Sequence, residues 1–240
     1  MALRRFRHVL VPLLAALALP GSASAQTGGA AAPTKGSGVA AASDGSFSLS
    51  ARAGTLLGRT VRFRGTVPDA HAGRTVTIER LDPLSAQWMP AVSTTVAGDG
   101  AFVARWRSDQ AGLLRVRARV EQAGAGGARA AAASPEIAVT VYKPATATWY
   151  GPGFYGRRTA CGQKMTRSLL GVAHKKLPCG TRVAILYKGA SIVVPVVDRG
   201  PFRKNTAWDL TIATARAVGF TYTDRIGAVR VRGGAANRAR

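Results

Sequence analysis

The 240-residue sequence contains few acidic residues and few cysteines. It has 11 Asp and Glu against 34 Lys and Arg, which gives a formal net charge of +23. Two cysteines are too few for a small disulfide-rich protein. An aromatic content of 7% and a charged content of 19% match neither a disordered chain nor a membrane channel. The length is sufficient for one or two folded domains.

The positive charge has two explanations. A net charge of +23 favours an anionic partner, such as nucleic acid or an envelope polymer. However, much of the charge is arginine in a sequence rich in alanine and glycine, which is also what a genomic composition bias produces. Charge alone therefore does not select a partner.

The N-terminus has the features of a secretory signal peptide. Three arginines within the first seven residues precede an apolar run over residues 9–19, and Ala23-Ser24-Ala25 provides small residues for cleavage. The apolar run is shorter than the roughly 20 residues needed to span a bilayer. We therefore expect residues 1–25 to be a signal peptide rather than a membrane anchor. The mature protein is expected to be secreted or in the cell envelope, extracellular or periplasmic, where disulfides can form.

The next two segments differ in composition. Residues 26–43 contain mainly Ala, Gly, Ser, Thr and Pro, which predicts a disordered linker. Residues 44–142 contain period-two strands, such as Val61 and Phe63 alternating with Arg62 and Arg64, separated by turn signals. This pattern predicts an immunoglobulin-like β-sandwich that acts as a spacer or adhesion module. Its arginines are expected to share one sheet face, which is either simply solvated or a surface for an anionic polymer.

A second unit is expected over residues 145–232, followed by a basic tail at 233–240. Short Val and Ile runs punctuated by Gly and Pro predict a compact β domain. One short helix is expected over residues 212–218, because Thr211 can cap its start and Gly219 can end it. The whole protein is thus predicted to be all-β apart from this helix.

Groups able to transfer a proton are rare in the second unit. Residues 145–240 contain 17 Lys and Arg but only three carboxylates, Asp198, Asp209 and Asp224, and one histidine, His174. With Cys161 and Cys179, His174 could supply three zinc ligands, but a structural zinc site needs a fourth. In a secreted protein a disulfide between the two cysteines is favoured, and no metal is expected.

Several segments of the second unit together resemble the rare lipoprotein A (RlpA) family. The resemblance is colinear over about 85 residues and lies in Trp149-Tyr150-Gly151-Pro152-Gly153-Phe154-Tyr155-Gly156, Arg158-Thr159-Ala160-Cys161-Gly162, Ala173-His174-Lys175-Lys176-Leu177-Pro178-Cys179-Gly180-Thr181, Val197-Asp198-Arg199-Gly200-Pro201-Phe202 and Asp209-Leu210-Thr211. It implies a six-stranded double-psi β-barrel, the fold also found in expansins. It also implies lytic transglycosylation of peptidoglycan between MurNAc and GlcNAc, which leaves 1,6-anhydro ends.

This reaction requires only one acid, because the C6 hydroxyl of the sugar replaces water as the nucleophile. Asp209 is predicted to be that acid, since it lies between Trp208 and Leu210 and matches the groove aspartate of expansin-like barrels. Asp198 is expected to stay ionised and stabilise positive charge, or only to shape its turn through Arg199. His174 is expected to hydrogen-bond a sugar or an aspartate, or to have a purely structural role.

Substrate contacts are assigned to residues in the shared motifs. Aromatic rings stack on sugar faces, although about half of the rings in a small barrel are expected in its core. The predicted substrate-binding residues are Trp149, Tyr150, Tyr155, Thr159, Arg199 and Phe202. The expected partners are peptidoglycan glycan strands and anionic wall polymers, with no nucleic acid and no cofactor. The protein is expected to be a monomer.

The sequence departs from the family at two positions. Family members usually carry a glutamate after the glycine of the Thr-Ala-x-Gly segment and an aspartate three residues later, where this chain has Gln163 and Thr166. Neither side chain can donate a proton as a carboxylic acid does. The alternative function is therefore a non-catalytic, expansin-like protein that binds cell-wall polysaccharide.

Overall fold

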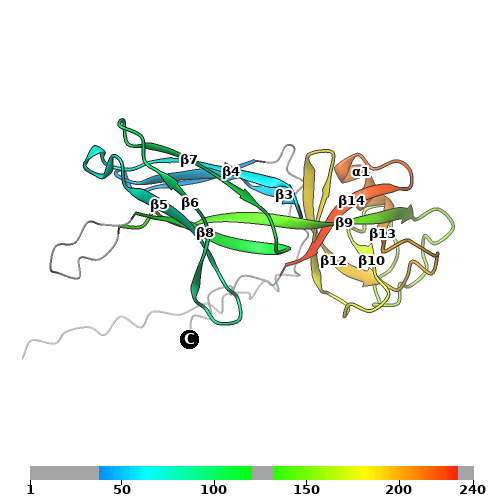
Figure 1. Cartoon of the computed structure of the whole chain (residues 1–240). Coiled ribbons are helices and arrows are strands. Elements are labelled where there is room, and N and C mark those ends of the chain that lie inside the picture. Colours follow the sequence, from blue (N-terminus) through cyan, green and yellow to red (C-terminus); the bar gives the residue numbers. More distant parts are fainter. Residues whose placement is uncertain (1–37, 121–131, 232–240) are drawn as a thin grey trace, which may run out of the picture.

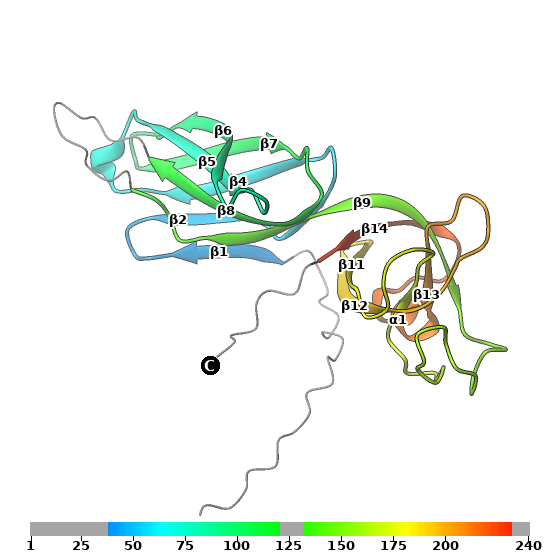
Figure 2. The ribbon, with the colours of Figure 1, turned by 90° about the horizontal axis from the view of Figure 1, so that it is seen from below.

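The computed structural model describes residues 38–120 and 132–231. These residues form two β-rich bodies, joined by the long strand β9 (Ile137–Tyr150) (Figures 1 and 2). The predicted signal peptide (1–25), most of the predicted linker and the basic tail (233–240) lie outside the described residues.

The N-terminal body consists of two sheets that enclose one hydrophobic core. The first has the strand order β1-β2-β4-β7, and the second contains β9-β8-β5-β6 with β3 on the other edge of β9. The bounds are β1 Val39–Ser43, β2 Ser48–Arg52, β3 Gly54–Leu56, β4 Thr60–Thr66, β5 Thr75–Leu81, β6 Trp88–Thr95, β7 Ala101–Arg107 and β8 Gly112–Val120, with the short 3₁₀ helix η1 at Asp69–His71. Phe63 and Trp106 of the first sheet and Ile78 and Val139 of the second belong to the same buried cluster. The expected sandwich is thus present as two packed sheets, while its immunoglobulin-like character stays a prediction.

The predicted linker extended too far along the chain. Residues 39–43 form β1, which pairs with β2 in antiparallel register from Val39 opposite Arg52 to Ser43 opposite Ser48. Ala40 and Ala42 also pack against the sandwich core. Backbone pairing and this small apolar contact order a segment whose composition resembles a linker.

The prediction that the arginines share one sheet face was also wrong. Arg62 of β4 lies directly opposite Arg105 of β7 in the first sheet. In contrast, Arg115, Arg117 and Arg119 lie on β8 in the second sheet. The alternation was identified correctly, but the sequence does not show which sheet each strand joins.

The C-terminal body is a closed six-stranded barrel, as predicted. Its strands follow one another as β9-β13-β10-β12-β11-β14 and return to β9, with parallel pairing at β9–β13 and β10–β12. The bounds are β10 Val172–Ala173, β11 Arg182–Tyr187, β12 Ala190–Asp198, β13 Trp208–Thr211 and β14 Asp224–Arg230. Val172, Ile185, Val196 and Leu210 fill the barrel core. The remaining barrel chain forms loops, which carry most of the polar motif residues.

Helix α1 (Ile212–Val218) confirms the predicted caps. The Thr211 hydroxyl accepts a hydrogen bond from the Thr214 backbone N–H at 3.3 Å. Gly219 ends the helix with φ of 74°, a left-handed conformation that glycine adopts without a Cβ penalty. The helix follows β13 directly and therefore fixes the end of the strand that carries Asp209.

The two residues between the predicted units, Lys143 and Pro144, are part of a strand. Both residues lie inside β9, whose N-terminal half pairs with β8 and β3 and whose C-terminal half pairs with β14 and β13. Each body therefore contributes hydrogen-bond partners to the same continuous strand. A proline is tolerated there because the chain changes sheets at this point.

Candidate functional site

An open cavity of about 590 Å³ lies on the barrel surface. Two of the three barrel carboxylates, Asp198 and Asp209, line it together. The other lining residues are Thr148, Trp149, Tyr150, Phe154, Ala173, Arg199, Gly200, Pro201, Phe202, Arg203, Tyr222 and Thr223. Asp224 is not among them.

The two aspartates meet because one short strand separates them. Ala173 of β10 pairs with Asp198 of β12 on one side and with Asp209 of β13 on the other. Neighbouring strands are about 4.8 Å apart, so the two aspartate backbones are about 10 Å apart. The small side chain of Ala173 leaves the space between them open, and Ala173 itself lines the cavity.

Asp209 has the character of a proton donor. Burial raises its pKa to about 6, and the negative charge of Asp198 adds to this rise. The Thr148 hydroxyl donates a hydrogen bond of 2.8 Å to Asp209 Oδ1 and opposes the rise, because it favours the ionised carboxylate. Thr148 and Asp209 are neighbours because they are register partners in the parallel pair β9–β13.

The apolar sequence neighbours of Asp209 do not surround its side chain, contrary to the prediction. Trp208 and Leu210 belong to the barrel core. Side chains alternate across a strand, so Asp209 points to the opposite face from these two neighbours. Its shifted pKa therefore results from the walls of the cavity and from Asp198, and its sequence neighbours only fix the orientation of β13.

Asp198 is held by three hydrogen bonds. Oδ1 accepts from the backbone N–H groups of Ala160 and Arg199, each at 2.8 Å, and Oδ2 accepts from the Tyr150 hydroxyl at 3.2 Å. Burial, followed by the charge of Asp198, raises the pKa of Tyr150, which therefore keeps its proton as a donor. The Arg199 guanidinium contacts the Asp198 carbonyl oxygen at 3.5 Å and Cys179 Sγ at 3.4 Å. Within the described residues, Arg199 thus forms no ion pair with the Asp198 carboxylate.

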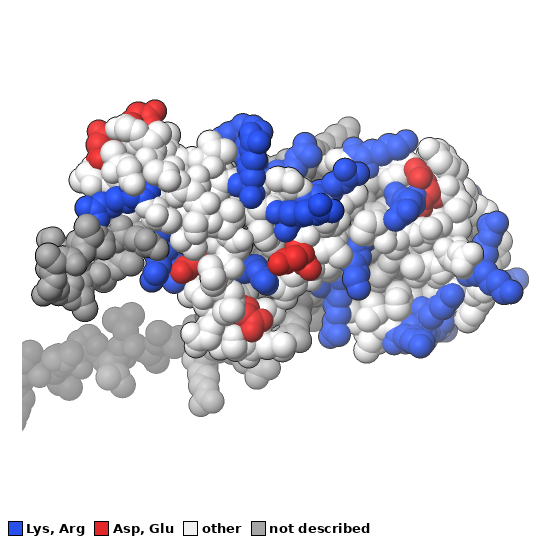
Figure 3. All heavy atoms as spheres, viewed as in Figure 1, with Lys and Arg blue, Asp and Glu red and all other residues white. Residues whose placement is uncertain are grey.

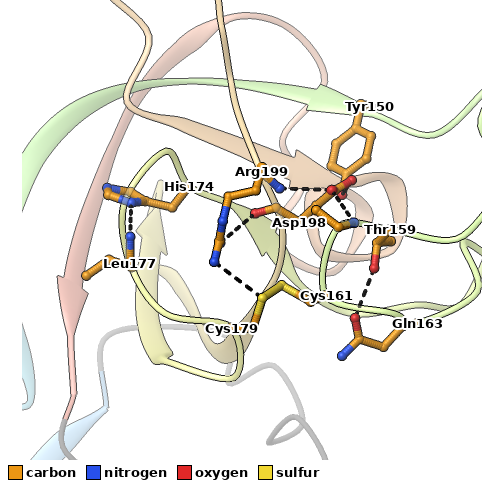
Figure 4. Close-up of a disulfide and its surroundings, with 10 residues drawn as sticks. Tyr150, Thr159, Cys161, Gln163, His174, Leu177, Cys179, Asp198 and Arg199 are labelled. Carbon is orange, nitrogen blue, oxygen red and sulfur yellow. Dashed lines mark hydrogen bonds between the residues drawn. A yellow bond between two sulfur atoms is a disulfide. The ribbon is translucent and has the colours of Figure 1, made fainter.

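His174 does not line the cavity. Its Nδ1 accepts hydrogen bonds from the backbone N–H groups of Lys176 at 3.1 Å and Leu177 at 2.9 Å, and its ring lies 4.5 Å from that of Trp208. Burial, with the positive charges of Arg199 and Lys175, lowers the pKa of His174. Figure 4 shows His174 beside Leu177, apart from the contacts between Asp198 and Tyr150. This arrangement supports the structural alternative for His174.

The predicted disulfide is present between Cys161 and Cys179, with Cα atoms 5.6 Å apart. It joins two loops next to Asp198 (Figure 4). Gln163, at the position where the family usually has glutamate, is exposed and bonded to the Thr159 hydroxyl at 2.9 Å. Neither Gln163 nor Thr166 lines the cavity.

The structure separates the predicted substrate-binding residues into two groups. Trp149, Tyr150, Arg199 and Phe202 line the cavity, whereas Tyr155 and Thr159 do not. The Phe202 side chain is 85% exposed and available for stacking on a sugar.

The lining residues that sequence reasoning did not select include Thr148, Phe154 and Tyr222. Thr148 and Tyr222 carried no signal of their own, and Phe154 was quoted within a motif without being assigned a contact. Phe154 and Tyr222 are 49% and 55% exposed, respectively. Exposed aromatic side chains at a cavity favour a ligand with flat apolar faces.

The described residues contain no metal-binding cluster and no membrane-spanning helix. No three His, Cys, Asp or Glu side chains gather there in a way that could hold a metal ion. None of the helices described is both long and apolar enough to span a membrane.

The barrel is similar in sequence to a described family and to several named bacterial proteins. Residues 143–233 match the DPBB_1 family, described as lytic transglycolase. A probable endolytic peptidoglycan transglycosylase RlpA of Synechocystis sp. is 49% identical over 79 residues, covering 32% of this chain and 25% of the relative. The endolytic peptidoglycan transglycosylases RlpA of Campylobacter jejuni and Pseudomonas aeruginosa are 38% and 41% identical over 84 and 80 residues. These two matches cover 34% and 32% of this chain and 30% and 24% of the relatives.

The chain therefore spans about a quarter to a third of the length of these relatives. The family match begins within β9 and includes the strands that carry both cavity aspartates. The closed six-stranded barrel, its short helix and the family match lead to one conclusion. The C-terminal domain is an RlpA-like double-psi β-barrel.

Proposed function

We propose that this protein is a secreted lytic transglycosylase that cleaves peptidoglycan glycan strands, with Asp209 as the general acid. The observation that carries the proposal is a carboxyl group with a pKa of about 6 lining an open cavity beside a second carboxylate, Asp198. A pKa close to the working pH lets one group both donate and accept a proton. The named activity of the RlpA relatives supports peptidoglycan as the substrate.

A single acid is sufficient for the proposed reaction. Protonated Asp209 donates its proton to the glycosidic oxygen between MurNAc and GlcNAc as the bond from that oxygen to C1 of MurNAc breaks. The C6 hydroxyl of the same MurNAc forms a bond to C1 and gives its proton to the Asp209 carboxylate. The products are a 1,6-anhydro end and a free GlcNAc hydroxyl. No water and no cofactor take part.

The other cavity residues support this step. Asp198, held by three donors, faces the positive charge that develops at C1. Phe202 and Trp149 offer surfaces for sugar rings, and Arg199 is kept in place by its contact with Cys179. His174 accepts hydrogen bonds from the backbone of the loop that contains Lys176 and Leu177. We therefore assign it a role in positioning this loop.

We place the protein in the cell envelope or outside the cell. The signal-peptide pattern in residues 1–25 supports export, and the disulfide is of a kind that persists in oxidising compartments. Peptidoglycan is also found there.

The test is to incubate the mature protein with denuded glycan strands and detect anhydro-muropeptides by mass spectrometry. Asp209→Asn is expected to lower product formation by a factor of at least about 100 while leaving binding to cell walls intact. Asp224→Asn is the matched control, because it makes the same chemical change outside the cavity, and it should retain activity.

Two results would reject the proposal. Undiminished product formation by Asp209→Asn would remove Asp209 as the acid. Retained wall binding by the wild-type protein without any anhydro product would instead support the expansin-like binding function, which the non-acidic Gln163 and Thr166 favour.

A further inference from the structure

A second and larger groove lies between the sandwich and the barrel. Its volume is about 1620 Å³, and its walls come from β2, β3, β4 and β7 of the sandwich and from β14 and the β11–β12 turn of the barrel. Figure 3 shows Lys and Arg side chains gathered along the upper face where the two bodies meet. The groove contains seven cationic residues, which are Arg52, Arg59, Arg62, Arg64, Arg107, Lys188 and Arg225.

The groove has little negative charge to balance these cations. Asp224 is the only carboxylate among its described lining residues. The Asp224 side chain already accepts hydrogen bonds from the Tyr187 hydroxyl at 2.9 Å and the Arg225 backbone N–H at 2.7 Å. The lining therefore carries a large net positive charge.

In the other sheet of the sandwich, by contrast, arginines form ion pairs with carboxylates. On β8, Arg115 forms an ion pair with Glu136, and Arg117 and Arg119 both reach Glu79. None of the groove arginines forms an ion pair within residues 38–120 and 132–231. A genomic bias toward arginine would raise the number of arginines, but it does not explain why the ion-paired arginines of the described residues all lie in one sheet.

The arginines on the β4–β7 face also repel one another. Arg62 lies directly opposite Arg105, and Arg64 is two residues further along β4 on the same face. Like charges directly opposite each other destabilise an antiparallel pair. Arg62 lines the groove and Arg105 does not, so an anion that contacts Arg62 in the groove would reduce this repulsion and be favoured by it.

We propose that the groove binds a linear phosphodiester polymer of the cell wall, a polyol phosphate. Six of the seven cations are arginine, whose planar guanidinium donates two parallel hydrogen bonds to a phosphate. Arg62 and Arg64 are about 7 Å apart along the strand, and other cations come from the barrel, so the surface suits a repeated charge better than a single ion.

The position of the groove supports a wall polymer as the occupant. Tyr222 and Thr223 line the candidate catalytic cavity, and Asp224 and Arg225, which follow them directly, line the groove. A polymer held in the groove would therefore lie next to a glycan strand held in the cavity. The choice of a wall polymer rather than nucleic acid rests on the envelope location given under the proposed function.

The experiment measures binding of fluorescently labelled poly(glycerol phosphate) to the full mature chain by anisotropy at several salt concentrations. The variant Arg62→Gln/Arg64→Gln/Arg107→Gln is expected to bind at least about tenfold more weakly. The slope of log affinity against log salt should fall by about 2, because each lost phosphate contact removes about 0.7 from the slope for a single-stranded polyanion. All three side chains are exposed, so the fold should survive, and circular dichroism checks this.

A matched control variant distinguishes binding in the groove from a general effect of the protein's positive charge. Lys164→Gln/Lys175→Gln/Lys176→Gln removes the same charge from exposed barrel loops that do not line the groove. This control is expected to change affinity by no more than about twofold. Equal losses in the two variants, or no binding by the wild-type protein at low salt, would overturn the proposal.

Two further probes identify the ligand class. Polygalacturonate of matched charge is expected to bind at least about tenfold more weakly than poly(glycerol phosphate), since its carboxylates do not offer phosphate geometry. Equal affinity for both would overturn the assignment to phosphate, and tighter binding of single-stranded DNA would overturn the assignment to a wall polymer. The arginine variant should still release anhydro-muropeptides from glycan strands that carry no polymer. Failure of the proposed catalysis would leave the binding result unchanged, so the two proposals are tested separately.

Discussion

The hydrogen bond from Thr148 to Asp209 provides a sharp test of the proposed acid. Thr148→Val removes the hydroxyl that donates at 2.8 Å to Asp209 Oδ1 and keeps a β-branched side chain of similar shape. A hydrogen bond to a charged group contributes about 1.5 kcal/mol, which corresponds to about one pKa unit. Since this bond favours the ionised form, its loss should raise the pKa of Asp209 from about 6 to about 7.

The sign of the effect on activity follows from the role of Asp209. A general acid works in its protonated form, so the rate falls as pH rises through its pKa. At pH 7 the protonated fraction should increase from about one tenth to about one half, and the rate roughly fivefold. An improved rate after loss of a hydrogen bond is not expected from a purely structural role.

The assay is the initial rate of anhydro-muropeptide release from denuded strands between about pH 4 and about pH 9. Carbon NMR of the Asp209 carboxyl group gives the pKa without turnover. Thr223→Val is the control, because Thr223 lines the cavity but makes no hydrogen bond to Asp209 in the described structure. A pH profile and an NMR pKa that do not move in Thr148→Val, or that move downward, would refute the reasoning.

Three other predictions concern the disulfide, the sandwich and the cavity rim. Replacing Cys161 and Cys179 by Ser should lower the free energy of unfolding by about 3 kcal/mol in urea titrations, because a closed loop of this length restricts the unfolded chain; an unchanged value would contradict this. Arg105→Thr should raise the free energy of unfolding by about 0.5 kcal/mol in the same assay, because it removes the like charge opposite Arg62. A decrease would show that the pair is not repulsive. Phe202→Ala should raise KM about three- to tenfold with kcat retained, since the ring is 85% exposed at the cavity; a loss in kcat alone would argue against stacking.

Local patterns in the sequence were sufficient to predict the individual elements. Period-two alternation identified strands such as β4, and the Thr211 and Gly219 caps delimited α1 to the residue. These features depend on contacts between residues close in the chain. The colinear motifs then indicated the barrel and both cavity aspartates.

Long-range register could not be predicted from the same patterns. Thr148 and Asp209 are 61 residues apart and become neighbours only through the parallel pairing of β9 with β13. The strand β1 depends on a partner strand rather than on its own residues, and the division of the arginines depends on which sheet each strand enters. Tyr155 and Thr159 belong to the shared motifs but do not line the cavity, and the Thr159 hydroxyl is instead bonded to Gln163.

The uninterrupted course of β9 limits how the two bodies can move. Every residue of β9 has a register partner on at least one neighbouring strand, so no unpaired hinge separates the two bodies, and the sandwich and the barrel should turn in solution as a single unit. If the sandwich side is tethered to one polymer of the wall, the barrel can reach only those glycan bonds at a set distance and angle from the tether. The spacing of cuts along a strand would then reflect the geometry of the protein rather than random encounters.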